Sequence, residues 1–199
     1  MAIQVEHEKR KHEILEKSLE LFIEEGYEYV TFQKIADRCG ITRTTLYIYF
    51  KNKREIFLWS IKQLIASLEK ELLVIIEDQS LGSRECMIKV LNTVLDKCEA
   101  STQFFKVLLS YLMQLQKSGI DANDRVERRV IRMNHLLSTI IIRGQRNGEF
   151  KKISVKNINH LLYTLVESAI FEIAVLGKKD VSETRQSIEF TVDSICLNK

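Results

Sequence analysis

The segment formed by residues 31–50, TFQKIADRCGITRTTLYIYF, decides how this chain folds. Gly40 divides it into two short stretches, each of which starts at or near a threonine whose hydroxyl can accept a backbone N–H bond as a helix N-cap. The apolar residues Ile35, Ala36 and Leu46 recur at helical spacing on the two sides of the glycine. The segment therefore predicts two short helices joined by a tight turn.

The composition of this turn meets the steric requirements of a helix-turn-helix. Glycine at position 40 permits a left-handed backbone, and the small Ala36 lets the second helix cross the first closely. The leading end of the second helix then projects outward, where an arginine can donate to guanine and threonines can contact thymine methyls or phosphates. The residues expected to face outward are Thr42, Arg43, Thr44, Thr45 and Tyr47.

Positive charge is concentrated in the same region. Residues 29–54 contain the six cations Lys34, Arg38, Arg43, Lys51, Lys53 and Arg54, against the single anion Asp37. Because affinity for phosphate depends on where the charges lie, this placement is more informative than the net charge of +3. Two interpretations remain: a DNA-binding surface, or a packing motif with a solvated basic face.

The whole chain favours an all-α fold. It has 199 residues, no proline and only seven glycines, so the usual helix breakers are nearly absent. Helical periodicity predicts about nine helices: one over 8–25, the two short ones, a long one over 53–77, and five more over 83–100, 102–117, 124–147, 155–176 and 181–197. Residues 1–52 are expected to form a helix-turn-helix domain and residues 53–199 a ligand-binding and dimerisation domain.

The N-terminal quarter of the chain resembles the TetR family of transcription regulators. The resemblance is carried by Ile14-Leu15, Leu21-Phe22, Glu25-Gly26-Tyr27, Thr31, Ile35-Ala36, Gly40-Ile41-Thr42, Thr45-Leu46-Tyr47, Tyr49-Phe50 and Lys53. It implies phosphate contacts by Thr31, Tyr47, Tyr49 and Lys53, and base or flanking contacts by Thr42, Arg43, Thr44 and Thr45. Thr44 departs from the Gly, Ala or Pro of many members, which leaves the preferred base sequence open.

Specific DNA recognition by such a motif normally uses two copies on a pseudo-palindrome, so we expect a homodimer. Residues 155–176 carry an apolar stripe wider than one core contact needs, and the last helix adds a second stripe. The predicted interface consists of Leu162, Val166, Ile170, Ile188, Val192 and Ile195. The alternative is a helix sunk in the core of the monomer.

The middle helices mix large apolar side chains with a few polar ones, as an effector pocket would. The predicted lining is Phe104, Leu108, Tyr111, Asn134, Leu137, Tyr163 and Glu167. The same spacing also fits ordinary core packing. If an effector binds here, we expect it to act by changing the tilt of the long helix over 53–77.

Other classes of function find little support. The chain has no Gly-rich phosphate loop, no His-Glu-x-x-His and no nucleophile elbow, so no catalytic residues, metal or cofactor are expected. His7 and His12 are expected near a frayed N-terminus. The apolar runs are too short to span a membrane, and we expect a soluble cytoplasmic protein. A ligand-responsive regulator, by resemblance a repressor, is predicted, with an enzyme and a purely structural bundle as alternatives.

Overall fold

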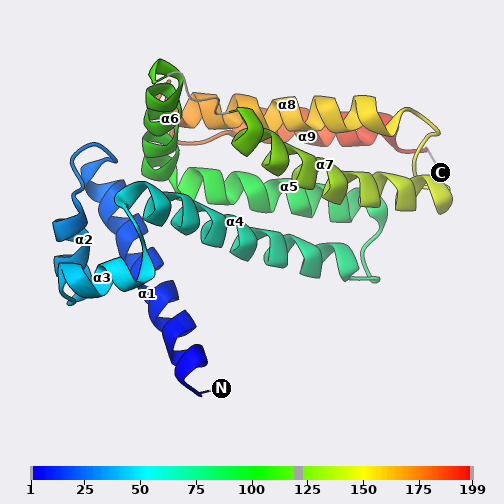
Figure 1. The fold of residues 1–199 in the computed structure, drawn as a ribbon. Coiled ribbons are helices and arrows are strands. Elements are labelled where there is room, and N and C mark those ends of the chain that lie inside the picture. Colours follow the sequence, from blue (N-terminus) through cyan, green and yellow to red (C-terminus); the bar gives the residue numbers. More distant parts are fainter. Residues whose placement is uncertain (1, 119–122, 198–199) are drawn as a thin grey trace. The chain divides into compact units, whose positions relative to one another are not determined.

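The computed structural model describes residues 2–118 and 123–197, and the side chains of residues 5–118 and 132–197. Within these ranges the chain forms nine helices and no strand (Figure 1), which confirms the predicted all-α fold. The helices are α1 (Ala2–Glu25), α2 (Phe32–Cys39), α3 (Arg43–Tyr49), α4 (Lys53–Glu77), α5 (Ser83–Ala100), α6 (Thr102–Lys117), α7 (Asn123–Arg146), α8 (Val155–Ala174) and α9 (Ser182–Ile195). None of the described helices is long and apolar enough to cross a lipid bilayer.

The chain divides into two compact units, Met1–Leu68 and Glu69–Lys199. The first contains α1, α2, α3 and the first part of α4, and the second contains the rest. The boundary predicted at residue 52 separates DNA binding from ligand binding and dimerisation, whereas this division separates compact units. The functional boundary remains a prediction.

The first unit is built around large apolar side chains from all four of its helices. Phe22, Ile35, Leu46 and Phe57 are fully buried, and the rings of Phe22 and Phe57 meet edge to face with centroids 4.8 Å apart. Burial of one such side chain contributes about 1.5–3 kcal/mol to stability. The two short helices are therefore anchored by the core, since helices of their length are not stable alone.

Helix α1 begins at Ala2, six residues before the predicted start. The N-terminal segment contains no glycine or proline, and polar side chains one turn apart pair along it: Arg10 with Glu13 at 2.9 Å and His12 with Glu16 at 3.3 Å. Such pairs stabilise helices modestly. The predicted start at residue 8 was too late, because it relied on apolar periodicity alone, and both His7 and His12 lie within α1.

The second unit has α5 at its centre, in contact with α7, α8 and α9, while α6 packs on α8. The start of α5 is capped by a distant residue: the backbone N–H of Ser83 donates to Glu149 Oε2 at 2.5 Å and the Ser83 hydroxyl to Oε1 at 3.1 Å. Partial burial opposes ionisation of Glu149, but hydrogen bonds from Ser83 and Asn147 and the charge of Arg143 together outweigh it and lower its pKa. The carboxylate thus satisfies donors that the helix leaves free.

Gly144, near the end of α7, gives room to a buried aromatic ring. A Cβ atom at this position would overlap the ring of Phe150, which is almost completely buried. A glycine-to-alanine change inside a helix usually stabilises it by about 0.5–1 kcal/mol. Here the absence of the side chain is what allows the ring to pack.

We expect Gly144→Ala to destabilise the protein by about 1–3 kcal/mol, because overpacking forces the Phe150 ring to shift. Urea unfolding of the full chain measures the change. The same substitution in a Phe150→Leu background should cost less, because the smaller side chain leaves space. A gain in stability for the single variant would show that the ring is not confined.

Candidate nucleic-acid interface

Helices α2 and α3 form the predicted turn. The Thr31 hydroxyl accepts from the backbone N–H of Lys34 at 3.2 Å, and the Thr42 hydroxyl accepts from that of Thr45 at 3.1 Å. Gly40 adopts the left-handed conformation at φ 65°. The two caps satisfy N–H groups at the helix starts and the glycine reverses the chain, so α3 begins directly after the turn.

One side of α3 is exposed along its length. Arg43, Thr44 and Tyr47 lie on the surface, and Thr45 is half-buried with its hydroxyl 2.8 Å from that of Thr42. Leu46 is fully buried and holds the opposite side of the helix in the core. The leading end of α3 is therefore accessible within its unit, as entry into a DNA groove requires.

Aromatic contacts hold Arg43 in place. The Phe32 ring of α2 lies 4.5 Å from the Tyr47 ring, and the Arg43 guanidinium donates to the Tyr47 hydroxyl at 3.1 Å. The guanidinium carbon also lies 5.7 Å from the centre of the Tyr47 ring. Because a guanidinium has five donors, Arg43 retains several for a base edge while Tyr47 limits its freedom.

Tyr49 lies near the N-terminal part of the chain. Its ring is half-buried and stacks on His7 of α1, with centroids 4.6 Å apart. The early start of α1 makes this contact possible. Any role of Tyr49 toward DNA therefore involves a ring that is already packed on one face.

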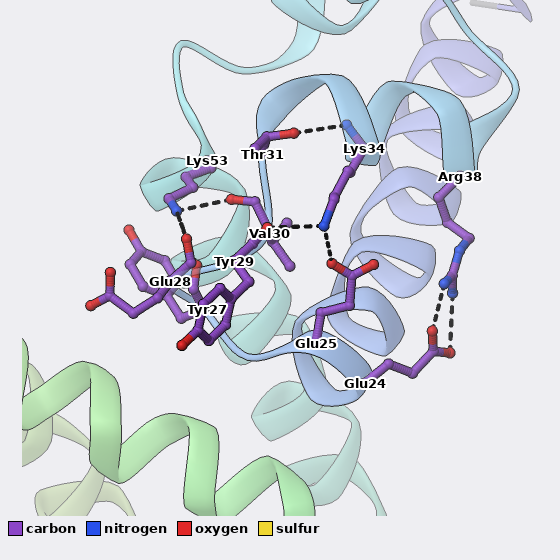
Figure 2. Close-up of polar contacts among 10 residues, drawn as sticks. All are labelled: Glu24, Glu25, Tyr27, Glu28, Tyr29, Val30, Thr31, Lys34, Arg38 and Lys53. Atoms are coloured by element: carbon purple, nitrogen blue, oxygen red, sulfur yellow. Dashed lines mark hydrogen bonds and ion pairs between the residues drawn. The ribbon is translucent and has the colours of Figure 1, made fainter.

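Lys53, expected to contact a phosphate, is engaged inside the protein. Its ammonium donates to the carbonyl oxygens of Tyr27 at 3.0 Å, Glu28 at 3.1 Å and Val30 at 2.9 Å (Figure 2). An ammonium has three N–H donors, so none remains for a phosphate in this arrangement. Burial lowers the pKa of Lys53, and the charge of Glu28 opposes the shift only in part.

Two further cations pair with acidic residues at the end of α1. Lys34 binds Glu25 at 2.5 Å, and Arg38 holds both carboxylate oxygens of Glu24, at 3.1 and 2.5 Å (Figure 2). The hydrogen bond from Arg38 lowers the pKa of Glu24. The concentration of charge inferred from residues 29–54 was therefore overestimated, because these anions lie just outside that range in sequence but beside the cations in space.

Sequence reasoning missed Ile48. This large apolar side chain is 70% exposed on α3, although an apolar residue between Leu46 and Phe50 would ordinarily be assigned to the core. The available signal was its position: in a helix, a residue two places from two buried residues four apart faces away from them. An exposed apolar side chain beside Thr44 suits contact with thymine methyls.

The residues predicted for the dimer interface mostly lie inside the protomer. Leu162, Val166, Ile188, Val192 and Ile195 are buried and Ile170 is half-buried. This corrects the prediction: their stripes face α5 and each other, and periodicity does not distinguish a partner helix from a neighbouring one. The same helices expose other apolar residues, among them Leu161, Phe171 at 53% and Phe190 at 77%.

The predicted effector-binding residues are spread from core to surface. Phe104, Tyr111 and Leu137 are buried, Leu108, Asn134 and Tyr163 are half-buried, and Glu167 is exposed. Burial raises the pKa of Tyr163 to about 12, and the charge of Glu167 adds to the shift. The structure thus places these residues on α6, α7 and α8 of one unit, with the aromatic ones innermost.

One polar residue of this region was not predicted. Asn159 of α8 is only 6% exposed, and its amide donates to the Asn134 carbonyl at 3.0 Å and the Ser138 hydroxyl at 2.6 Å. The side-chain oxygens of Asn159 and Asn134 are buried, and neither has a hydrogen-bond partner among the residues whose side chains are described. Buried acceptors without donors are uncommon and call for an explanation.

The capped turn and the exposed α3 form a helix-turn-helix, an architecture typical of DNA-binding regulators. Residues 14–58 match the family model described as bacterial regulatory proteins, tetR family. The N-terminal region of the chain is therefore similar to the DNA-binding domain of TetR-family regulators.

Similarity extends beyond the matched domain at low identity. The fatty acid metabolism regulator protein of Bacillus subtilis (strain 168) is 19% identical over 159 residues, which cover 79% of this chain and 80% of that protein. A TetR transcription regulator from Haloarcula marismortui ATCC 43049 has a similar fold, with a TM-score of 0.84 and 19% identity over 96% of this chain and all of that one. FadR from Bacillus subtilis, solved with stearoyl-CoA, has a TM-score of 0.71 and 20% identity over 90% and 96% of the two chains.

Proposed function

We propose that the protein is a cytoplasmic repressor that binds a palindromic operator as a homodimer and releases it when an effector binds the second unit. Residues 1–52 carry the DNA contacts, and residues 53–199 carry the effector and the dimer interface. The observation that supports this most directly is the exposed, capped α3 with Arg43 held at its leading end.

The DNA contacts divide by chemistry. Arg43, Thr44, Thr45 and Ile48 reach base edges or the adjacent backbone, because they lie on α3 near its leading end. Thr31, Thr42, Tyr47 and Tyr49 supply hydroxyl groups suited to phosphates. Ordered hydroxyl contacts fix the register of the protein on the duplex, and Arg43 supplies the strongest discrimination between bases.

Selection of bound sequences from a random pool of double-stranded DNA tests the proposal. The full chain should enrich a palindrome whose half-sites are separated by about 10 base pairs, centre to centre, or a multiple. A matched pool presented to an Arg43→Ala variant should give a weaker consensus. Enrichment of no sequence, together with the absence of salt-dependent binding to random duplex, would refute the proposed function.

The homodimer uses the outer surfaces of α8 and α9. Phe171 and Phe190 are more than half exposed, and Leu161 of α8 is nearly so. Large exposed aromatic side chains are enriched in protein interfaces, and helices α8 and α9 run alongside each other (Figure 1). Two copies related by a two-fold axis would bury these side chains in a four-helix contact.

The effector we propose is a fatty acyl thioester. The relatives named as fatty acid regulators support this class, and so does the aromatic and aliphatic lining supplied by Phe104, Tyr111 and Leu137. The unpartnered oxygens of Asn134 and Asn159 would accept from amide or hydroxyl groups at the polar end of such a ligand. An apolar site with a few polar anchors is the usual form of a small-molecule pocket.

The effector class is tested by measuring whether stearoyl-CoA releases the protein from the selected operator. Free CoA, which lacks the acyl chain, is the control. We expect Asn159→Leu to bind operator normally but to need at least about tenfold more stearoyl-CoA for release, because the ligand loses a buried acceptor. Asn157→Leu, at an exposed position of α8, should respond like the wild type. Equal release by CoA alone, or by neither compound, would reject the acyl thioester.

A further inference from the structure

The turn between α1 and α2 is held by two lysines. Each of the four consecutive carbonyl groups of residues 27–30 accepts a hydrogen bond from a lysine ammonium: three from Lys53, and that of Tyr29 from Lys34 at 3.2 Å (Figure 2). The Lys53 ammonium also lies 4.8 Å from the centre of the Tyr27 ring. The three N–H donors of the Lys53 ammonium are thus all used within the protein.

The backbone at this turn explains why it takes up a cation. Gly26 ends α1 with a left-handed φ of 85°, so the carbonyls that follow leave the helical hydrogen-bond pattern. Backbone acceptors that are partly buried need donors. The three rotatable donors of one ammonium can serve three such carbonyls at once.

Lys53 connects this turn to a firmly anchored element. It is the first residue of α4, whose start is capped by Asn52 Oδ1 accepting from the Glu55 N–H at 2.9 Å. Ile56 and Phe57, one turn further on, are fully buried in the first unit. The side chain of Lys53 therefore fixes the turn relative to the start of α4.

The turn formed by residues 27–30 leads directly into α2 and α3, the two helices of the helix-turn-helix. Val30, whose carbonyl Lys53 binds, immediately precedes Thr31, the N-cap of α2. Helix α2 supports α3 through the Phe32–Tyr47 contact. A displaced turn would move the cap, then α2, and then the outer side chains of α3.

We infer that Lys53 is a positioning residue for DNA binding: its ammonium holds the 27–30 turn, and with it Thr31 and α2, in the geometry that DNA requires. This inference rests on the proposed DNA binding. It assigns to Lys53 a role other than the phosphate contact expected from the sequence. Burial of the ammonium, which lowers the pKa of Lys53, agrees with an internal role.

The dependence of affinity on salt distinguishes the two roles. A phosphate contact that is lost reduces the slope of log affinity against log salt by about 0.9. Loss of a positioning contact weakens binding but leaves the slope unchanged, since the same phosphates are still met. Arginine separates the roles further: it suits phosphate, but its planar guanidinium does not reproduce the three-carbonyl arrangement of an ammonium.

The experiment compares the full-length wild type, Lys53→Met, Lys53→Arg and the exposed control Lys51→Met on the selected operator across a range of salt. Both Lys53 variants should bind at least about tenfold more weakly with the wild-type slope. Amide hydrogen exchange should accelerate over residues 26–34 and not over α5. Lys51→Met should show normal exchange there.

A reduced slope in Lys53→Met, or wild-type affinity in Lys53→Arg, would overturn the inference. Unchanged exchange over residues 26–34 would do the same. If Lys53→Met does not fold, the salt dependence and the hydrogen exchange are both measured on Lys53→Arg. If the wild type binds no DNA, the proposed function fails, and the exchange measurement still decides whether Lys53 holds the turn.

Discussion

Replacing Arg43 with alanine is expected to weaken binding to the selected operator by about 10- to 100-fold for each altered half-site contact. A bidentate contact from a guanidinium to guanine is the strongest single source of discrimination available to α3. Affinity for random duplex should fall much less, because phosphate contacts dominate non-specific binding. Fluorescence anisotropy with both DNAs at fixed salt measures the two effects.

Two variants show whether the geometry around Arg43 matters. Arg43→Lys keeps the charge but loses the planar donor pair, so it should resemble alanine on the operator and the wild type on random DNA. Tyr47→Phe removes the hydroxyl that accepts from Arg43 at 3.1 Å and should produce a smaller loss of specificity. An equal loss on both DNAs for Arg43→Ala would place Arg43 on the phosphate backbone instead.

Introducing aspartate at both Phe171 and Phe190 is expected to convert the dimer to a monomer and to reduce operator affinity on the order of 100-fold. The charges would have to be buried without partners in the proposed interface, while neither position belongs to the core of the protomer. Sedimentation velocity measures the association state, and circular dichroism confirms that the helices remain.

Val74→Asp is the matched control, because Val74 is an exposed apolar residue of α4, outside the proposed interface. It should leave the dimer intact. If the double variant still forms a dimer, the interface lies elsewhere on the protein. A wild type that sediments as a monomer at micromolar concentration and on operator DNA would contradict the homodimer itself.

The local features of the DNA-binding unit were predictable from sequence. Thr31 and Thr42 cap the helices that they were expected to cap, and Gly40 adopts the left-handed turn. These interactions join residues three or four positions apart, so the sequence places the partners together whatever the rest of the chain does. The ends of α5 and α6 also fall where the predicted helices end.

Predictions that depended on distant neighbours were less successful. The partners of Lys53 lie 23 to 26 residues away, and no pattern in the sequence indicates that its ammonium faces carbonyl groups. The buried stripe containing Leu162 and Val166 was assigned to a partner subunit because an apolar face looks the same whichever helix covers it. That Phe171 and Phe190 reach the surface was evident only once the covering helices were known.

The sequence by itself determined that this chain is helical, where its caps and turns lie, and that its N-terminal region is a helix-turn-helix of the TetR family. Only the tertiary structure decided which cations are free and which apolar faces reach the surface. The physical reason is the distance along the sequence between the residues that interact. Helix caps and turns are governed by contacts within one or two helical turns, whereas ion pairs such as Arg38 with Glu24 and the burial of a helix face depend on which elements pack together.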